Sequence, residues 1–253
     1  MAPSIPRAAK RMLAACMLAT LLAPQAALAG DYARTEILGF SGDGAHFAFE
    51  EYGIQDGSGF PWSNLYVIDV ARDNWVAGSP FRRLDEVDDS QPLDFEAELA
   101  RTRAANHEAA RAAIETVAIS GAGTTVAHNP PTERGADPHL MIAGTRAAAP
   151  AIGPTVELRL TETPVQRPAN CPEGFGTMQG FRLTLTHDGE TRVLNDDTRL
   201  PDSRGCALRY RIDRLVMHYP QEMGRPVFAV LVLVERVGFE GPDGRYIAIT
   251  GRL

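Results

Sequence analysis

The chain contains 253 residues, and its 32 Asp and Glu residues outnumber its 25 Lys and Arg residues, which gives a formal net charge of −7. The densest run of arginines, residues 204–214, is accompanied by Asp202 and Asp213. A nucleic-acid-binding protein needs a basic surface that neutralises phosphates, so the charge pattern excludes that class of function.

The first 29 residues have the layout of a secretory signal peptide. Residues 7–11 include three basic side chains, an apolar run follows from Met12 to Ala23, and small residues end the segment at Ala29. The apolar run is shorter than the roughly 20 residues that a membrane-spanning helix needs, and no later stretch of that length lacks charges. We therefore expect cleavage after Ala29, which leaves a periplasmic or secreted chain (residues 30–253) without a membrane span.

Residues 35–70 alternate apolar and polar side chains with the period of two that is typical of β-strands. Phe47 and Phe49 share one face, so the segment is predicted to form a β-hairpin. The adjacent acids Glu50 and Glu51 point to opposite faces of such a strand and cannot form a close acid/base pair.

The connection predicted between the two strands, residues 54–64, is longer than a tight hairpin needs. Aromatic and polar side chains lie there between glycines, as in many binding loops. One interpretation is that the loop presents these side chains to a partner; the other is that its aromatic side chains fold back against the sheet as a lid. The candidate binding residues are Gln55, Asp56, Ser58, Phe60, Trp62 and Asn64.

An alanine-rich run begins at Pro92, after the acidic linker 85–89, and extends to about residue 115. Acidic side chains lie early in this run and arginines later, which suits the dipole of one long helix. Its apolar stripe is thin, because after Phe95 and Leu99 it consists mostly of alanines. We therefore expect the helix to lie on the surface of a β-sheet.

A Pro-rich segment after this helix carries His128, Glu133, Asp137 and His139. Their spacing matches no zinc pattern, so we expect no metal and no cofactor. Together with Asp56, however, His128, Glu133 and His139 could form the site of a hydrolase of unrecognised type. That activity requires the four side chains to converge in one pocket.

From Thr155 to Leu253 the chain is a succession of strand patterns separated by turns. The run Val227–Val234 is apolar at every position, which predicts a central strand covered on both faces. We therefore expect a mainly β fold with one long helix (α+β), in which antiparallel sheets form a sandwich-like or partial-propeller-like body.

The Ala- and Pro-rich segment 147–154 is the natural boundary between two parts of the chain. Residues 30–146 then hold the hairpin, the helix and short strands, and residues 155–253 hold the antiparallel β region. We expect the two parts to pack as one globular unit.

Cys171 and Cys206 are the two cysteines beyond the signal peptide. An exported protein folds in an oxidising compartment, so we expect these two residues to form one disulfide bond. A redox-active pair would need a close Cys-x-x-Cys spacing, which is absent.

Four motifs follow one another along the chain: GFSGDGAHFAFEEYGIQDGSGFPWSNLYVIDV (39–70), AHNPPTERGADPH (127–139), DTRLPDSRGC (197–206) and GFEGPDGRYIAI (238–249). Together they resemble the predicted-secreted-protein family classed as domain of unknown function 2259, found in Gram-negative bacteria. The resemblance spans nearly the whole mature chain and implies an exported protein, without assigning a catalytic residue. SGDGAHFAF followed by NLYVIDV is also similar to one blade of a TolB-type β-propeller, a fold that needs at least four blades.

Two functions from different classes agree with the sequence. The first is a non-enzymatic periplasmic binding or accessory protein that presents the 54–64 loop to an envelope protein or glycan. The second is the hydrolase with a site near Asp56, His128, Glu133 and His139. The first is favoured because the chain contains no recognised nucleophile or metal-ligand motif. The sequence leaves the oligomeric state open.

Overall fold

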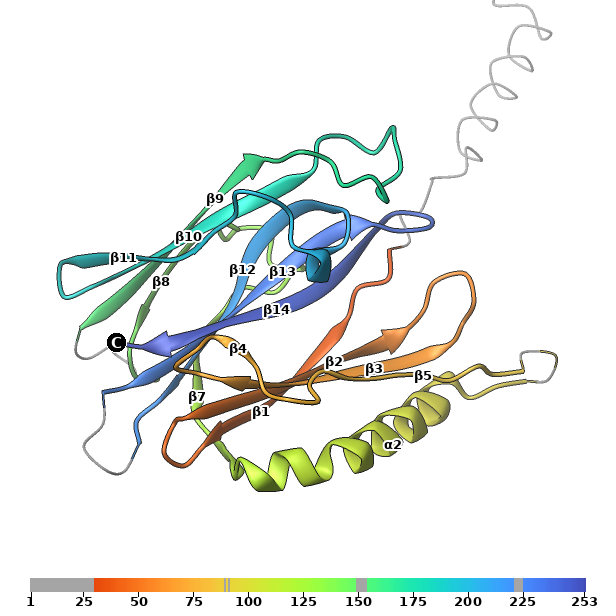
Figure 1. Ribbon diagram of the computed structural model, residues 1–253, viewed down its shortest axis with the longest axis horizontal. Helices are drawn as coiled ribbons and strands as arrows, with labels where there is room; N and C mark the ends of the chain where they lie inside the picture. The colour runs from red at the N-terminus through yellow and green to blue at the C-terminus, as the bar shows by residue number, and fades with distance from the viewer. Residues whose placement is uncertain (1–29, 89, 91, 149–153, 221–224) are drawn as a thin grey trace, which may run out of the picture.

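The computed structural model describes residues 30–88, 90, 92–148, 154–220 and 225–253. The predicted signal peptide and most of the 147–154 boundary lie outside these residues. The described strands form three antiparallel sheets, which we name A, B and C, and one long helix (Figure 1). The predicted class, mainly β with one helix, is therefore confirmed.

Sheet B is built from the N-terminal part of the described chain, residues 34–122. From one edge to the other it contains β4 (Asn74–Trp75), β3 (Pro61–Asp69), β2 (His46–Ile54), β1 (Arg34–Ser41) and β6 (Ile119–Ala122), with β5 (Phe81–Leu84) also paired to β3. The predicted hairpin is thus β2 and β3, and β1 adds a third strand on its other side.

Sheets A and C combine strands from both sides of the predicted boundary. Sheet A contains β14 (Pro242–Arg252), β13 (Val227–Val237), β12 (Ala207–His218) and β7 (Thr124–His128). Sheet C contains β11 (Glu190–Asp196), β10 (Gln179–His187), β9 (Thr155–Pro164) and β8 (Leu140–Gly144). The division into parts at 147–154 stays a prediction, but β7 and β8 precede it and pair with strands that follow it.

Strand β13 lies at the centre of the molecule, because sheet A is stacked between sheets B and C (Figure 1). Every residue from Val227 to Val234 is buried, as the unbroken apolar run predicts. Phe228 and the alternate residues after it pack toward sheet C, whereas Ala229 and its alternates pack toward sheet B. Because successive side chains of β13 point to opposite faces, this strand contributes to the core between sheets A and C and to the core between sheets A and B.

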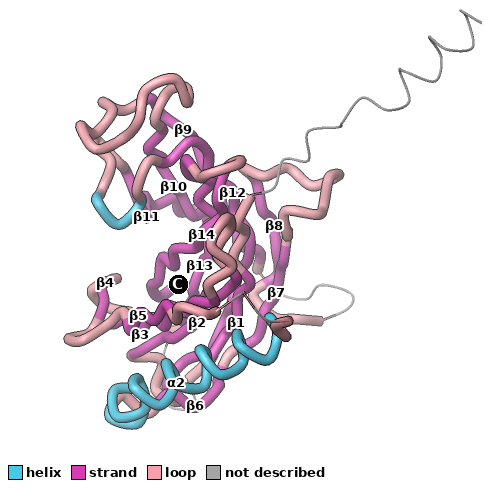
Figure 2. Tube along the Cα trace, turned by 90° about the vertical axis from the view of Figure 1, so that its right-hand side faces the viewer, coloured by secondary structure: helices cyan, strands magenta, loops and turns pink. Residues whose placement is uncertain are grey.

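Helix α2 (Phe95–Thr116) covers the outer face of sheet B (Figure 2). Its first turn is capped by Asp94, whose carboxylate accepts a hydrogen bond from the Ala97 amide. The surface position and the approximate bounds agree with the sequence prediction. Phe95 differs from the prediction, since its side chain is 42% exposed and does not continue the buried stripe.

Polar side chains anchor α2 to sheet B. Glu50 is fully buried beneath the helix and accepts hydrogen bonds from Ser63, Arg103 and His107. The helix residue Asn106 is also buried, and its amide donates to the Ser63 hydroxyl. A helix with few large apolar residues is thus held by satisfied hydrogen bonds as well as by packing.

The connection between β2 and β3 is shorter than predicted. Strand β2 continues to Ile54 and β3 begins at Pro61, and these two residues pair across the hairpin. Only residues 55–60 connect the strands. Trp62 therefore belongs to a strand, where its side chain is 6% exposed and packs in the core between sheets A and B.

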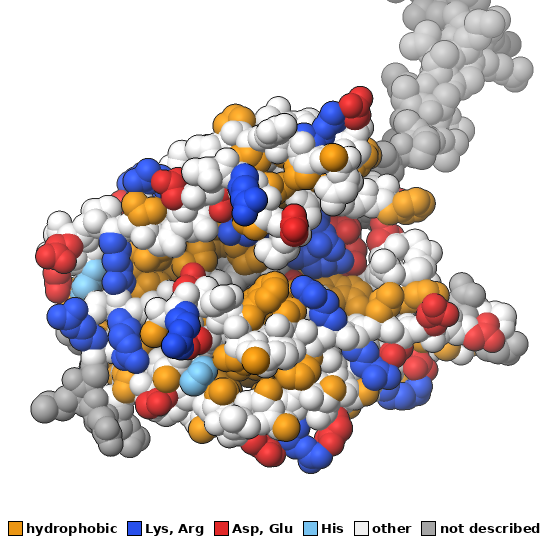
Figure 3. Space-filling model, viewed as in Figure 1, with side chains coloured by type: hydrophobic (Ala, Val, Ile, Leu, Met, Phe, Trp, Pro, Cys, Tyr) orange, Lys and Arg blue, Asp and Glu red, His pale blue; other side chains and the backbone are white. Residues whose placement is uncertain are grey.

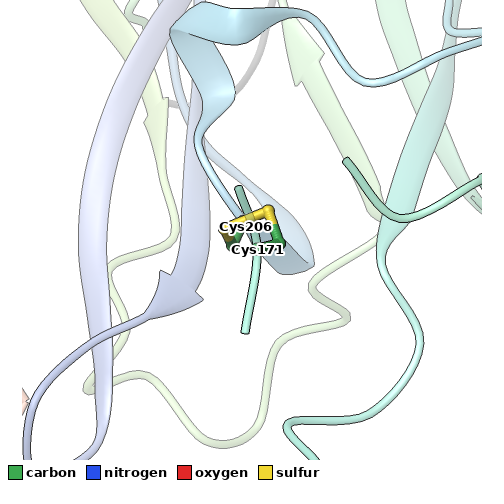
Figure 4. The surroundings of a disulfide bond; sticks show 2 residues. All are labelled: Cys171 and Cys206. Carbon is green, nitrogen blue, oxygen red and sulfur yellow. A yellow bond between two sulfur atoms is a disulfide. The ribbon is translucent and has the colours of Figure 1, made fainter. Parts of the chain in front are cut away.

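The predicted disulfide bond joins Cys171 to Cys206, with 5.5 Å between their Cα atoms (Figure 4). It links the connection between β9 and β10 to the start of β12. Among the described residues, no helix is long and apolar enough to cross a membrane.

Candidate functional site

A cleft follows β14, the edge strand of sheet A, between sheet B and the short 3-10 helix η1 (Asp202–Arg204). Figure 2 shows η1 and β4 on opposite sides of this edge. The innermost part encloses about 130 Å³, and two wider parts of about 330 Å³ each extend from it. Adjacent parts share lining residues, so the cleft is continuous; Figure 3 shows hydrophobic and basic side chains beside the hollow.

Four arginines from different parts of the chain line the innermost part: Arg82, Arg204, Arg236 and Arg245. Arg204 pairs with Asp197 at 2.9 Å and Arg245 pairs with Asp31 at 2.5 Å.

The other two arginines, Arg82 and Arg236, have no carboxylate within ion-pair distance in the part of the chain that the structure describes. Burial lowers the pKa of Arg236, and the nearby positive charge of Arg245 lowers it further. The carboxylates of Asp243, Glu51 and Asp31 act in the opposite direction, but none of them lies within ion-pair distance of the Arg236 guanidinium group.

The acids of the cleft, in contrast, already have hydrogen-bond donors. Glu51 is 2% exposed, and its Oε1 atom accepts hydrogen bonds from Asn64 at 3.1 Å and the Tyr66 hydroxyl at 2.8 Å. Its Oε2 atom accepts from the Tyr246 backbone amide at 2.7 Å. Asp73 at the far end accepts from the amide and hydroxyl of a β14 residue. The groups that remain available to bind a ligand are therefore hydrogen-bond donors, namely the N–H groups of the arginine side chains.

One wall of the cleft is aromatic. Phe49 stacks on Tyr66 with 4.7 Å between ring centroids, and Tyr66 lies 5.9 Å from Trp75. Trp75 is 40% exposed at the rim, with the Arg82 guanidinium 5.8 Å from its ring centroid. The site thus combines cationic donors with flat apolar faces, which suits a ligand that has an anionic end and an apolar body.

The residues predicted to bind in the 54–64 segment divide into two groups. Gln55, Trp62 and Asn64 line the cleft, and Asn64 reaches its innermost part. The others lie in the β2–β3 connection outside the cleft lining: Asp56, Ser58 and Phe60. The Ser58 hydroxyl donates to the Gln55 side chain at 2.9 Å, so it serves the turn. The binding role of all six residues stays a prediction.

The four residues of the alternative hydrolase site have different neighbours. His128 lies 3.6 Å from Asp213, and His139 lies 3.2 Å from the backbone carbonyl of Tyr210. Glu133 accepts from the Gly135 amide, and Asp56 is in the β2–β3 connection. No contact joins any two of the four among the described residues, so the hydrolase stays a hypothesis. No described group of His, Cys, Asp and Glu is arranged to hold a metal ion.

The cationic part of the cleft was missed by reasoning from the sequence, because its residues are far apart along the chain. Arg82, Arg236 and Trp75 lie outside any local pattern. The family motifs did carry a signal, because several of them contribute to the cleft. The motif at residues 39–70 supplies the wall formed by sheet B, and the motif at residues 197–206 supplies η1. The motif 238–249 supplies the floor of the cleft through four residues of β14: Arg245, Tyr246, Ile247 and Ala248.

The fold is mainly β with one long helix, and three of the motifs seen in the sequence contribute to one cleft. The chain belongs to the family of predicted secreted proteins described as DUF2259, whose family model matches residues 48–252. The resemblance seen in the sequence is thereby confirmed, whereas the similarity to one TolB-type blade and cleavage after Ala29 stay predictions. Comparisons with curated proteins and with solved structures gave no match.

Proposed function

We propose that this protein is a non-enzymatic, exported binding protein whose cleft along β14 holds a small anionic ligand. One observation carries the proposal. Arg82 and Arg236 face the same cleft without a carboxylate partner in the described chain, while the acids beside them have their donors. A ligand that supplies anionic acceptors would complete these hydrogen bonds in a partly desolvated site, where they are strongest.

Binding is favoured over catalysis by the chemistry of the lining. The described lining residues include Ser203 but no His that could activate it and no Cys. Glu51 already accepts three hydrogen bonds, which occupy three of the roughly four lone-pair sites of a carboxylate. The β2–β3 connection flanks the mouth through Gln55, and its predicted role in recognition is part of the same proposal.

The test is direct binding to the purified chain that begins at Gly30, with small anions of graded shape such as phosphate, citrate and benzoate. An anion that binds the folded state at 100 times its Kd stabilises the protein by about 2.7 kcal/mol, which a thermal shift detects. We expect Arg82→Gln and Arg236→Gln each to weaken binding at least about tenfold, since a hydrogen bond to a charged group contributes about 1.5–3 kcal/mol.

The matched control is Arg134→Gln, which removes the same charge from an exposed residue outside the cleft. Sodium chloride at equal ionic strength controls for screening. The proposal fails if no anion in the panel stabilises the protein, or if the Arg134 variant loses as much affinity as the cleft variants.

A further inference from the structure

The outward edge of β14 is capped almost continuously. In an antiparallel edge strand, the amides of alternate residues point away from the sheet. The Gly244 amide donates to the Asp31 carbonyl at 3.0 Å, and the Tyr246 amide donates to Glu51 at 2.7 Å. Further along, the Thr250 amide donates to a carboxylate oxygen of Asp73 at 2.6 Å.

Ala248 interrupts this series of outward amides that have a hydrogen-bond acceptor. It lies midway between Tyr246 and Thr250, so its amide points outward with theirs, and it lines two adjoining parts of the cleft. Within the part of the chain that the structure describes, no group accepts a hydrogen bond from this amide. Both neighbouring outward amides have a carboxylate as acceptor, and the middle one does not.

We propose that the Ala248 amide donates a hydrogen bond to the carboxylate of a ligand, and that the ligand is a small aromatic carboxylate whose ring lies against Trp75. The inference rests on the proposed function and names its ligand class. A carboxylate at this amide repeats the hydrogen bond that Glu51 and Asp73 make on either side. Its second oxygen faces the guanidinium groups of the cleft, whose planar fork matches a carboxylate.

The size of the cleft agrees with a single ring. The innermost part encloses about 130 Å³, slightly less than the apolar cavity of about 150 Å³ that holds benzene. The adjoining part shares Trp75 and Ala248 with it and adds about 330 Å³, so the ring and its carboxylate have room across the two parts. Tyr66 and the 40%-exposed Trp75 supply flat faces at the same place. The capping carboxylates lie about 7 Å from the Ala248 position along the strand, at about 3.4 Å per residue. A single carboxylate therefore fits between them without displacing either.

A peptide strand is the other ligand that an edge strand attracts, and the structure argues against it. Strand addition needs consecutive outward amides and carbonyls to be available. Here the Gly244 position is occupied by residues 31–33, and the Tyr246 and Thr250 amides are occupied by side chains. One available amide can hold one acceptor group, but it cannot pair a strand.

The decisive variant is Ala248→Pro, which deletes the amide hydrogen. Because this amide points away from the sheet, proline removes no hydrogen bond of the β13–β14 ladder. Ala248→Ser keeps the amide and is the matched control. The probe is benzoate, compared by calorimetry with the neutral analogue benzamide and with inorganic phosphate. We expect Ala248→Pro to weaken benzoate binding at least tenfold, the Ser variant to bind within about twofold of wild type, and benzamide to bind at least tenfold more weakly than benzoate.

Equal benzoate affinity in wild type and Ala248→Pro would overturn the inference. Binding of phosphate but not benzoate, still lost in Arg236→Gln, would also overturn it while the proposed function stands. If no anion binds the wild type, both fail. If the proline variant does not fold, the amide resonance of Ala248 in ¹⁵N-labelled wild type decides. A shift of that resonance with benzoate and not with benzamide supports the inference, and an unmoved resonance refutes it.

Discussion

Trp62 and Trp75 are the only two tryptophans of the chain, and the structure gives them opposite roles. Trp62 is 6% exposed in the core between sheets A and B, with the Arg245 guanidinium 4.3 Å from its ring centroid. Truncation of a buried Trp to Ala costs about 3–5 kcal/mol, because apolar contacts are lost and a cavity remains. At about 2–4 °C per kcal/mol for a chain of this size, Trp62→Ala should lower Tm by roughly 6–20 °C.

Trp75→Ala provides the matched control. Its side chain is 40% exposed and contacts the Tyr66 ring and the Arg82 guanidinium at the rim of the cleft. We expect a loss of about 1 kcal/mol or less, which corresponds to at most about 4 °C. Circular dichroism at a series of temperatures gives Tm for both variants without any ligand, and urea unfolding gives the free energies.

The comparison also separates the two interpretations of the segment 54–64. A lid or core residue destabilises the fold when truncated, whereas an exposed recognition residue leaves Tm nearly unchanged and affects only binding. A Trp62→Ala variant within 1 kcal/mol of wild type, or equal losses in both variants, would refute the assignment of Trp62 to the core.

Two further predictions concern stability. Burial alone would raise the pKa of Glu50, but hydrogen bonds from His107, Arg103 and Ser63 lower it, and the bond to Glu50 raises the pKa of His107. The stabilisation by Glu50 is therefore lost as pH falls below its usual pKa of 4.5, and that by His107 is lost as pH rises above its usual pKa of 6.5. Asp213, whose pKa burial raises to about 6, also titrates in this range, so the test is the difference in urea unfolding free energy between wild type and His107→Gln across pH. That difference should be largest below pH 6.5 and shrink above it, and a difference that does not change with pH would contradict the network. Reduction of the Cys171–Cys206 bond, which spans 35 residues, should lower the unfolding free energy by about 4 kcal/mol. Urea unfolding with and without dithiothreitol measures this, and a change below about 1 kcal/mol would count against a stabilising disulfide.

Features that depend on a local period could be predicted from the sequence. The odd- and even-numbered residues of Val227–Val234 are all apolar, and they face opposite sides of a strand, so burial on both faces could be expected. Helix α2 followed from composition and charge order, and the disulfide followed from the two cysteines that remain after the predicted signal peptide.

Features that depend on a tertiary partner could not be predicted from the sequence. Thr102 and Asn106 are buried on α2 because Asp85 and Ser63 receive their hydrogen bonds, and nothing in the helix sequence marks those partners. The glycines between residues 54 and 64 indicated a long loop, but Ile54 pairs with Pro61, so both strands extend into that segment. The cleft was hidden for the same reason, since its arginines come from separate segments.

The hydrogen bonds along the outward edge of β14 bear on whether this edge could pair with another strand. An uncovered edge strand recruits other strands, and proteins suppress this with charges or a covering segment. Here Glu51 and Asp73 bring carboxylates to the outward amides, and residues 31–33 cover the remaining end. The protection is complete enough to exclude a strand, and it leaves an opening at Ala248 of the size of one functional group. Arg82 and Arg236 line the same part of the cleft as Ala248, so under the proposed function the arrangement that protects the edge would also select an anionic ligand.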